Sequence, residues 1–331
     1  MIISRTPVRV SFCGGGTDLA AYYTNSKEGG LVTSLAIQRF IYVTVNPRFD
    51  DSIRLSYSQT EMVDQIEDLQ HELVREALRL TGVTKGVEIT TIADIPGRGT
   101  GLGSSSTLTV GLLNALHTYA GRPASPSQLA EEAYWIEHEV LGQPCGKQDQ
   151  YAAACGGINQ IAFLPDETVQ VTPLEVSDET VERIGREFHL IYTGITRRAS
   201  DVLDEQQRQT KDKMAQLDIM RMQARAARIA LEEGNLEQLA SLLHEGWILK
   251  RGLASGVTQD SIDELYQDLR ELGATGGKLL GAGGGGFILF HLPLGLRAKV
   301  SREYPQQRIL PLEVARQGST IIFNDDRGGR E

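Results

Sequence analysis

A run of glycines and serines stands directly before a predicted helix and has the composition of a phosphate-binding loop. Residues 96–106 read Pro-Gly-Arg-Gly-Thr-Gly-Leu-Gly-Ser-Ser-Ser, and leucines at helical spacing follow. The unpaired N–H groups and the dipole at a helix N-terminus favour an anion, and glycines let the backbone curl around it. The alternative is a tight turn with Ser104 as a simple N-cap, but a cap needs one serine and no ladder of glycines. We therefore predict phosphate binding by Gly99, Gly101, Leu102, Gly103, Ser104, Ser105 and Ser106.

Two other stretches, at residues 14–16 and 276–286, are also rich in glycine. Gly makes up 35 of the 331 residues, against a usual level of about 7%. Residues 281–286 match GxGxxG, but they follow helical sequence and open a strand, the reverse of the order in a dinucleotide-binding fingerprint. The chain also lacks GxxxxGK followed by Ser or Thr, which excludes a P-loop. These observations disfavour a NAD-dependent oxidoreductase and indicate backbone that approaches a ligand closely.

Two acidic residues stand where a carboxylate needs an explanation. Glu137 lies on the apolar stripe of a predicted helix at residues 127–141, so it needs a metal or an ion-pair partner to offset its lost hydration. Asp149 lies in the first turn of the next predicted helix, where a carboxylate also complements the helix dipole. Each residue therefore has two interpretations, one chemical and one structural.

Three further polar residues are candidates for ligand contacts. Asp18 follows the first glycine stretch and suits hydrogen bonds from vicinal sugar hydroxyls, although an aspartate after glycines is also a common turn residue. Arg9 alternates with valines, so it either faces a ligand or decorates a strand. Arg197, with Arg198 beside it, suits bidentate contacts with a phosphate, or it begins a solvated helix.

The charge balance disfavours two broad classes of binding protein. Lys and Arg number 33 against 43 Asp and Glu, a formal net charge of −10, so we expect neither a general nucleic-acid binder nor a binder of anionic membranes. Cys13, Cys145 and Cys155 form no CxxC pair and support neither a zinc site nor a disulfide scaffold. The N-terminus has no apolar signal core, and no stretch reaches the roughly 18 apolar residues of a membrane helix. We therefore expect a cytoplasmic protein.

The hydrophobic periodicity predicts strands and helices that do not alternate strictly, which indicates an α+β fold. A polar stretch at residues 177–186 is the expected boundary between domains at 1–180 and 187–331. Strands are expected at residues 8–12, 31–37, 40–45, 53–57, 87–92, 157–163, 168–174, 188–193, 287–292, 309–314 and 320–323, and helices at 65–80, 104–119, 127–141, 147–154, about 199–272 and 296–304.

Three stretches of the chain resemble the signature motifs of the GHMP kinases, the family of galactokinase, homoserine kinase, mevalonate kinase and phosphomevalonate kinase. They read Thr-Pro-Val-Arg-Val-Ser-Phe-Cys-Gly-Gly-Gly-Thr-Asp at residues 6–18, Gly-Leu-Gly-Ser-Ser-Ser at 101–106 and Lys-Leu-Leu-Gly-Ala-Gly-Gly-Gly-Gly at 278–286. Their order and spacing agree with the family over nearly the whole chain. The Gly-Gly-Gly-Thr-Asp form, residues 146–154 and residues 192–197 are most similar to the D-glycero-D-manno-heptose 7-phosphate kinases within it.

The resemblance implies a fold and an activity. The fold would have a ribosomal protein S5 domain 2-like N-terminal domain, a ferredoxin-like C-terminal domain and an active site in the cleft between them. The activity would be phosphorylation by ATP, with Mg²⁺, of the anomeric O1 of a heptose 7-phosphate in nucleotide-activated heptose synthesis. The alternatives are another sugar kinase, for fucose or galactose, and a sensor that binds sugar or nucleotide without turnover. The expected partners are small molecules, and a homo-oligomer stays open.

The resemblance also implies roles for individual residues. Asp149 would face the acceptor hydroxyl as a base or an electrostatic anchor, with Lys147 stabilising its carboxylate, and Arg9 would lie near the acceptor oxygen. Glu137 would bind Mg²⁺ together with Ser105, Ser104 being the alternative hydroxyl. The expected substrate-binding residues are Gly14, Gly15, Gly16, Thr17, Asp18, Lys147, Thr193, Gly194, Arg197, Gly283 and Gly284.

Overall fold

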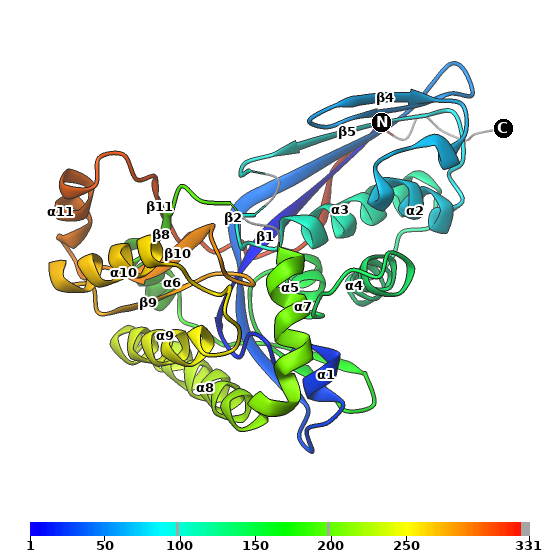
Figure 1. Cartoon of the computed structure of the whole chain (residues 1–331). Helices are drawn as coiled ribbons and strands as arrows, with labels where there is room; N and C mark the ends of the chain where they lie inside the picture. Colours follow the sequence, from blue (N-terminus) through cyan, green and yellow to red (C-terminus); the bar gives the residue numbers. More distant parts are fainter. Residues whose placement is uncertain (97–98, 197–198, 326–331) are drawn as a thin grey trace.

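The first half of the chain builds an eight-stranded sheet around two long strands (Figure 1). The computed structural model describes residues 1–96, 99–196 and 199–325. In the middle of the sheet, β1 (Ile2–Cys13) pairs antiparallel with β2 (Gly30–Pro47). The other strands are β3 (Ile53–Ser56), β4 (Thr60–Val63), β5 (Val87–Ala93), β6 (Ile158–Phe163), β7 (Val169–Pro173) and β12 (Thr320–Asn324). They follow the order β12-β1-β2-β5-β3-β4, and β6 pairs with both β2 and β7.

The strand β2 joins two segments that the sequence predicts as separate strands, at residues 31–37 and 40–45. Its first part pairs with β6 and its second part with β5. Gln38 and Arg39, which lie between the two segments, are neither glycine nor proline, so the backbone stays extended through them. Both parts of the sheet are therefore tied to one continuous strand.

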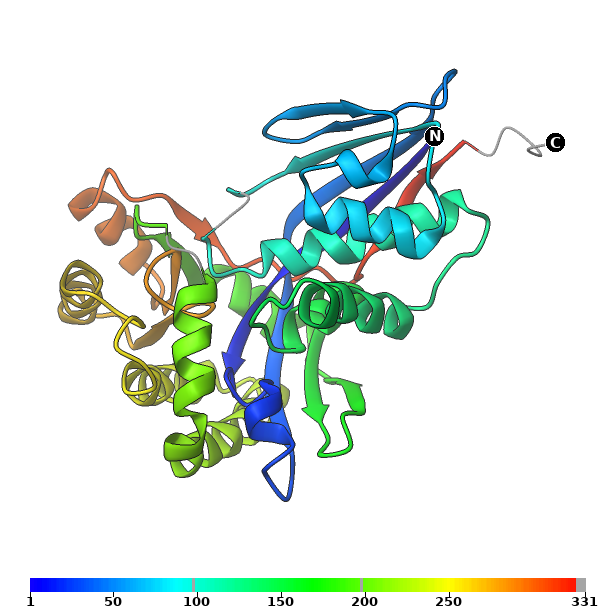
Figure 2. The same cartoon turned by 45° about the vertical axis from the view of Figure 1, so that its right-hand side comes forward.

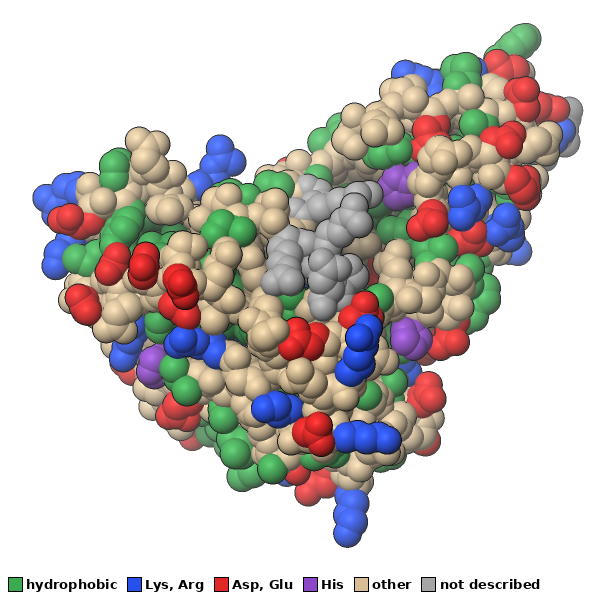
Figure 3. Space-filling view, viewed as in Figure 1, with side chains coloured by type: hydrophobic (Ala, Val, Ile, Leu, Met, Phe, Trp, Pro, Cys, Tyr) green, Lys and Arg blue, Asp and Glu red, His purple; other side chains and the backbone are tan. Residues whose placement is uncertain are grey.

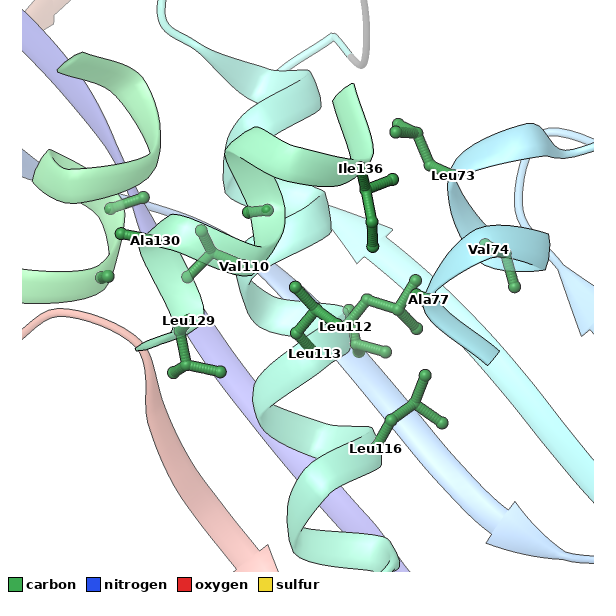
Figure 4. Close-up of a cluster of buried hydrophobic side chains, with 14 of the residues drawn as sticks. Leu73, Val74, Ala77, Val110, Leu112, Leu113, Leu116, Leu129, Ala130 and Ile136 are labelled. Carbon is green, nitrogen blue, oxygen red and sulfur yellow. The ribbon is translucent and has the colours of Figure 1, made fainter. Parts of the chain in front are cut away.

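Three helices cover one face of this sheet (Figures 1 and 2). The helix α3 (Ser104–Tyr119) begins and ends where the sequence predicts it, and its leucines pack against α2 (Glu72–Thr81) and α4 (Pro126–Tyr134) in a buried cluster (Figure 4). The predicted helix at 65–80 is instead a 3₁₀ turn (Ile66–Asp68) followed by α2, because Leu69 is extended. The short helices α1 (Ala20–Tyr23) and α5 (Gln148–Cys155) complete this half.

A four-stranded antiparallel sheet forms the core of the second half. Its order is β11-β8-β10-β9, with bounds β8 (Phe188–Tyr192), β9 (Gly276–Leu279), β10 (Phe287–His291) and β11 (Ile309–Pro311). The helices are α6 (Asp178–Glu187), α7 (Ala199–Gln209), α8 (Met214–Glu232), α9 (Leu236–Arg251), α10 (Asp260–Leu272) and α11 (Leu296–Glu303), with a 3₁₀ turn (Thr210–Lys213) before α8.

Two elements of the second half differ from the prediction. The polar stretch at residues 177–186 forms the helix α6, because the Ser177 hydroxyl caps it and Ile184 on its inner face is buried. The sequence does not predict strand β9, because two of its four residues are glycines, which are uncommon in strands. A side chain at Gly276 would meet the Ala240 carbonyl oxygen at 1.9 Å, so α9 packs directly on the strand.

The two halves share a hydrophobic cluster and are not separated by a simple linker. Val10 and Phe12 of β1 belong to the same buried cluster as Phe188 and Leu190 of β8. The last strand, β12, returns to the first sheet and pairs with β1. The division at 1–180 and 187–331 stays a prediction. The space-filling view shows a notch between two arms, with acidic and basic side chains intermingled on this face (Figure 3).

Candidate active site

Arg9 and Asp149, the two residues predicted to be catalytic, form a bidentate ion pair. The Arg9 Nε donates to Asp149 Oδ1 and Nη2 donates to Oδ2, both at 2.7 Å. The third guanidinium nitrogen, Nη1, donates to the Gly101 carbonyl oxygen at 2.6 Å. Arg9 is buried in the middle of the molecule, so it is not a decoration of β1. One guanidinium thus joins β1, the first turn of α5 and the predicted phosphate loop.

Lys147 does not stabilise the Asp149 carboxylate, and that prediction is wrong. Its ammonium lies over the rings of Tyr23 and Tyr134, 5.3 and 5.0 Å from their centroids. It donates to the Glu167 carbonyl oxygen at 2.9 Å, and burial lowers the pKa of the ammonium. Its neighbours are protein groups, so Lys147 ties the β6–β7 hairpin to the start of α5, and its predicted contact with substrate gains no support.

The predicted phosphate loop packs backbone to backbone against the third glycine stretch. A Cβ on Gly101 would meet the Leu280 carbonyl oxygen at 2.5 Å, and one on Gly281 would meet the Gly101 Cα at 2.4 Å. The Phe287 N–H donates to the Thr100 carbonyl oxygen at 3.1 Å. Any side chain at these glycines would push the loop away from the second half of the molecule.

The N-terminus of α3 lies beside Asp149 and carries no side-chain cap. Gly103 is the N-cap, with φ of 73°, and no side chain bonds to the first turn from it. A Cβ there would lie 3.0 Å from the Asp149 Oδ2. The interpretation of Ser104 as a simple N-cap is therefore wrong, because Ser104 is already helical. The first-turn N–H groups and the Asp149 carboxylate therefore lie in one corner of the structure, an arrangement that suits phosphoryl transfer.

Glu137 is buried and is held by three uncharged side chains. Its carboxylate accepts hydrogen bonds from Ser106 Oγ at 2.7 Å, Thr109 Oγ1 at 2.9 Å and Gln150 Nε2 at 2.6 Å. Within the described residues no ion pair involves Glu137, so it is not half of a buried salt bridge. It lies in a π-helical turn (Trp135–Val140), a distortion that is frequent at functional sites. Burial raises the pKa of this carboxyl despite the three hydrogen bonds.

The donor set around Glu137 fits Mg²⁺ in its chemistry. Carboxylate and hydroxyl oxygens are the ligands that this ion takes, and a cation would offset the burial of the carboxylate. The hydroxyl that bonds to Glu137 belongs to Ser106, whereas Ser105 is exposed. The described residues contain no cluster of three or more His, Cys, Asp or Glu for a metal, so any Mg²⁺ here needs ligands from elsewhere, such as phosphate oxygens.

The turn at Gly14, Gly15 and Gly16 holds Asp18 close to the ion pair. The Gly16 N–H donates to Asp18 Oδ1 at 2.9 Å, and the carboxyl is buried, which together with the charge of Asp149 raises its pKa. Thr17 was predicted to bind substrate, and the structure does not support this role. It is fully buried and its hydroxyl donates to the carbonyl oxygens of Gly14 and Leu31, so it shapes the turn and does not face a ligand.

The predicted substrate residues of the second half lie in the third glycine stretch or beside it. Thr193 Oγ1 donates to the Gly286 carbonyl oxygen at 2.9 Å, and Gly194 after it is exposed. The Gly284 N–H donates a hydrogen bond to the Val257 carbonyl oxygen, and a Cβ on Gly283 would collide with that same oxygen. Both glycines therefore pack against protein backbone. Arg197 lies outside the described residues.

Two buried lysines at this site were not identified as important from the sequence. Lys250 of α9 donates to the Gly281 carbonyl oxygen, and Lys278 of β9 donates to the carbonyl oxygens of Ser11 and Phe12 at 3.0 Å each. Lys250 continues the buried face of α9 that includes Leu243 and Trp247. The periodicity that singles out Glu137 would also have found Lys250.

The chain is similar to known proteins over most of its length. The family model "GHMP kinases N terminal domain" matches residues 69–157, and "GHMP kinases C terminal" matches residues 227–307. The chain is 30% identical to a D-glycero-alpha-D-manno-heptose 7-phosphate kinase of Campylobacter jejuni, over 87% of this chain and 88% of that protein. It is 26% identical to a galactokinase of Pyrococcus furiosus, over 86% and 87% of the two chains.

A solved structure gives a similar result. A D-glycero-D-manno-heptose 1-phosphate kinase of Bacteroides thetaiotaomicron superposes with a TM-score of 0.81 at 25% identity, over 98% of this chain and 99% of that one. Among the helices that the structure describes, none is both long and apolar enough to cross a bilayer.

The close backbone contact predicts that Gly281→Ala destabilises the fold more than a glycine substitution in open space. Gly121 has a similar positive φ but no atom near its Cβ position, so Gly121→Ala isolates the conformational cost, about 1 kcal/mol. Gly281→Ala adds overpacking, about 1 to 3 kcal/mol more. Urea unfolding of both variants measures the difference, and equal costs would contradict the contact.

The raised pKa of Glu137 predicts how stability depends on pH without divalent cations. The folded state holds this proton more tightly than the unfolded chain, so the contribution to the free energy of unfolding is present at low pH and is lost as pH rises through the folded pKa. Asp18 acts in the same direction. Glu137→Gln should make this fall shallower in unfolding curves with a chelator, whereas Glu139→Gln, at an exposed position, should not. If the free energy of unfolding of Glu137→Gln falls with pH as steeply as that of wild type, the pH dependence does not come from Glu137.

Proposed function

Because the chain belongs to the GHMP kinases, ATP-dependent phosphotransferases with an alcohol group as acceptor, we propose that its acceptor is D-glycero-D-manno-heptose 7-phosphate and its product the 1,7-bisphosphate. Similarity to heptose phosphate kinases supports a sugar kinase. The observation that carries the proposal is the Arg9–Asp149 pair held against the N-terminus of α3. The product would feed nucleotide-activated heptose synthesis in the cytoplasm.

Phosphoryl transfer asks the protein mainly for position and charge. The phosphate loop at residues 99–106 would hold the nucleotide phosphates with backbone N–H groups. Asp149 would accept the hydrogen bond of the acceptor hydroxyl and take its proton as the acceptor oxygen bonds to the γ-phosphorus and the bond to the β-phosphate oxygen breaks, which releases ADP. Because Arg9 occupies one lone pair on each carboxylate oxygen, each oxygen keeps one for the substrate. Arg9 also offsets the negative charge that develops on the acceptor oxygen.

Glu137, with Ser105 or Ser106, would hold Mg²⁺. The ion supplies neutralisation of the phosphate charge when bound. The chain's own contribution is the buried carboxylate, which Thr109 and Gln150 orient toward the first turn of α3.

Two alternatives remain. A different sugar acceptor is favoured by the similarity to a galactokinase over nearly the whole chain. A sensor without turnover is disfavoured, because the Arg9–Asp149 pair is complete and buried only in part, with 22% of the Asp149 side chain exposed for a substrate.

Release of ADP over a panel of acceptors tests the substrate. The panel is heptose 7-phosphate, unphosphorylated heptose, hexoses, hexose phosphates, fucose and mevalonate. We expect the highest kcat/KM with heptose 7-phosphate. A higher kcat/KM with fucose or galactose would replace the proposed acceptor, and no ADP release with any acceptor would favour the sensor.

Asp149→Asn tests the catalytic step. The amide keeps the shape of the side chain but removes the charge that orients the hydroxyl and the oxygen that takes its proton. We expect kcat to fall by about a hundredfold or more, with ATP affinity nearly intact because the phosphate loop is untouched. Asp64→Asn, at an exposed position, is the matched control. Full turnover in Asp149→Asn would remove this residue from the mechanism.

A further inference from the structure

Lys250 is a lysine in the core of the molecule. It lies on the buried face of α9 below Leu243 and Trp247, and only 6% of the residue is exposed. A lysine in the last turn of a helix usually extends into water and interacts with the carbonyls of its own helix. Lys250 instead donates to the carbonyl oxygen of Gly281, in the third glycine stretch. Its ammonium therefore points into the active site region.

Because Lys250 bonds to Gly281, its amine lies close to the predicted phosphate loop. Gly281 is the residue whose backbone touches Gly101, and Gly101 accepts the hydrogen bond of Arg9. Lys250 and Arg9 thus bond to the two glycines on either side of one backbone contact. The catalytic corner and Lys250 belong to the same small region of the cleft.

The charges around Lys250 do not balance. The charged groups that act on it are Lys278, Arg9, Asp18 and Asp149. Arg9 holds both oxygens of Asp149, and Asp18 is bound by backbone N–H groups. Within the described part of the chain, no salt bridge involves Lys250 or Lys278, so these two buried amines act on one another electrostatically and neither has a carboxylate partner.

A buried ammonium without a counter-ion is costly, because it loses hydration and gains no ion pair. Burial accordingly lowers the pKa of Lys250 well below its ordinary value and that of Lys278 to about 8. A purely structural lysine would gain stability by replacement with an apolar residue. A dianion placed beside these amines would supply the missing charge and favour their protonated forms.

We propose that Lys250 is a phosphate-binding residue of the active site, with Lys278 adding to the positive potential beside it. The ligand group is a phosphate dianion, either the phosphoryl group in transfer or the phosphate that the acceptor already carries. Its negative charge favours the protonated form of the buried amine. The inference rests on the proposed sugar kinase activity for its substrate and on the two lysines for its site.

The first test is the affinity and turnover of Lys250→Met. Methionine keeps the length of the side chain and removes the charge. We expect kcat/KM to fall by about tenfold or more, whereas Lys299→Met, an exposed lysine on α11, should behave as wild type. If kcat/KM of Lys250→Met falls with heptose 7-phosphate but not with unphosphorylated heptose, Lys250 binds the phosphate that the acceptor already carries. An equal loss with both, mainly in kcat, identifies the transferred group, and no loss with either overturns the proposal.

The second test separates binding from a structural role. We expect the ligand-free Lys250→Met protein to unfold at the same temperature as wild type or higher, because an apolar side chain replaces a buried amine that has no ion-pair partner. A large drop in the unfolding temperature with unchanged kcat/KM would make Lys250 structural and would overturn the proposal.

The third test uses the wild-type protein alone, so it does not depend on the folding of a variant. Calorimetry of inorganic phosphate, ATP and heptose 7-phosphate in buffers of different ionisation enthalpy should show proton uptake with at least one of them near pH 8, and Lys250→Met should lose it. Proton uptake with none of the three would overturn the assignment. Phosphate binding with proton uptake but no ADP release from any acceptor would contradict the proposed kinase activity alone.

Discussion

The contact between the backbones of Gly101 and Gly281 is the constraint on which the rest of the site depends. It brings the phosphate loop of the first half and the glycine stretch of the second half closer than any side chain would allow. The carbonyl oxygen of each glycine also accepts a hydrogen bond from a basic side chain. Arg9 donates to Gly101, and Lys250 donates to Gly281. The glycines therefore fix the positive charges of the site as well as the shape of the loop.

Local charge explains how an acidic protein accommodates anionic ligands. The chain has a net charge of −10, while the basic residues Arg9, Lys250 and Lys278 are buried in its interior. Charges taken out of water interact more strongly than surface charges and are screened less by salt. Buried basic groups and a helix N-terminus would therefore favour a phosphate locally, although the net charge of the chain is negative.

The sequence predicted those features that depend on local pattern. The bounds of α3 follow from periodicity, and the motif resemblance places Arg9 and Asp149 near the same acceptor oxygen without predicting the ion pair between them. It failed where the partner is distant in the chain. Lys147 is near Asp149 in sequence, but its ammonium reaches Tyr23 and Glu167, and Arg9, 140 residues away, takes the carboxylate. Likewise β12 pairs with β1 across the whole chain, which no local pattern specifies.

Four buried ionisable groups around the cleft are displaced in opposite directions. Burial raises the pKa of Glu137 and Asp18 and lowers that of Lys250 and Lys278. In each case burial disfavours the charged form, and within the described residues no salt bridge supplies a counter-charge. Under the proposed function, a phosphate bound together with a metal ion would supply both kinds of counter-charge. The packing around the site thus holds these groups in a costly arrangement, and binding of the proposed substrate would relieve that cost where the reaction needs charge.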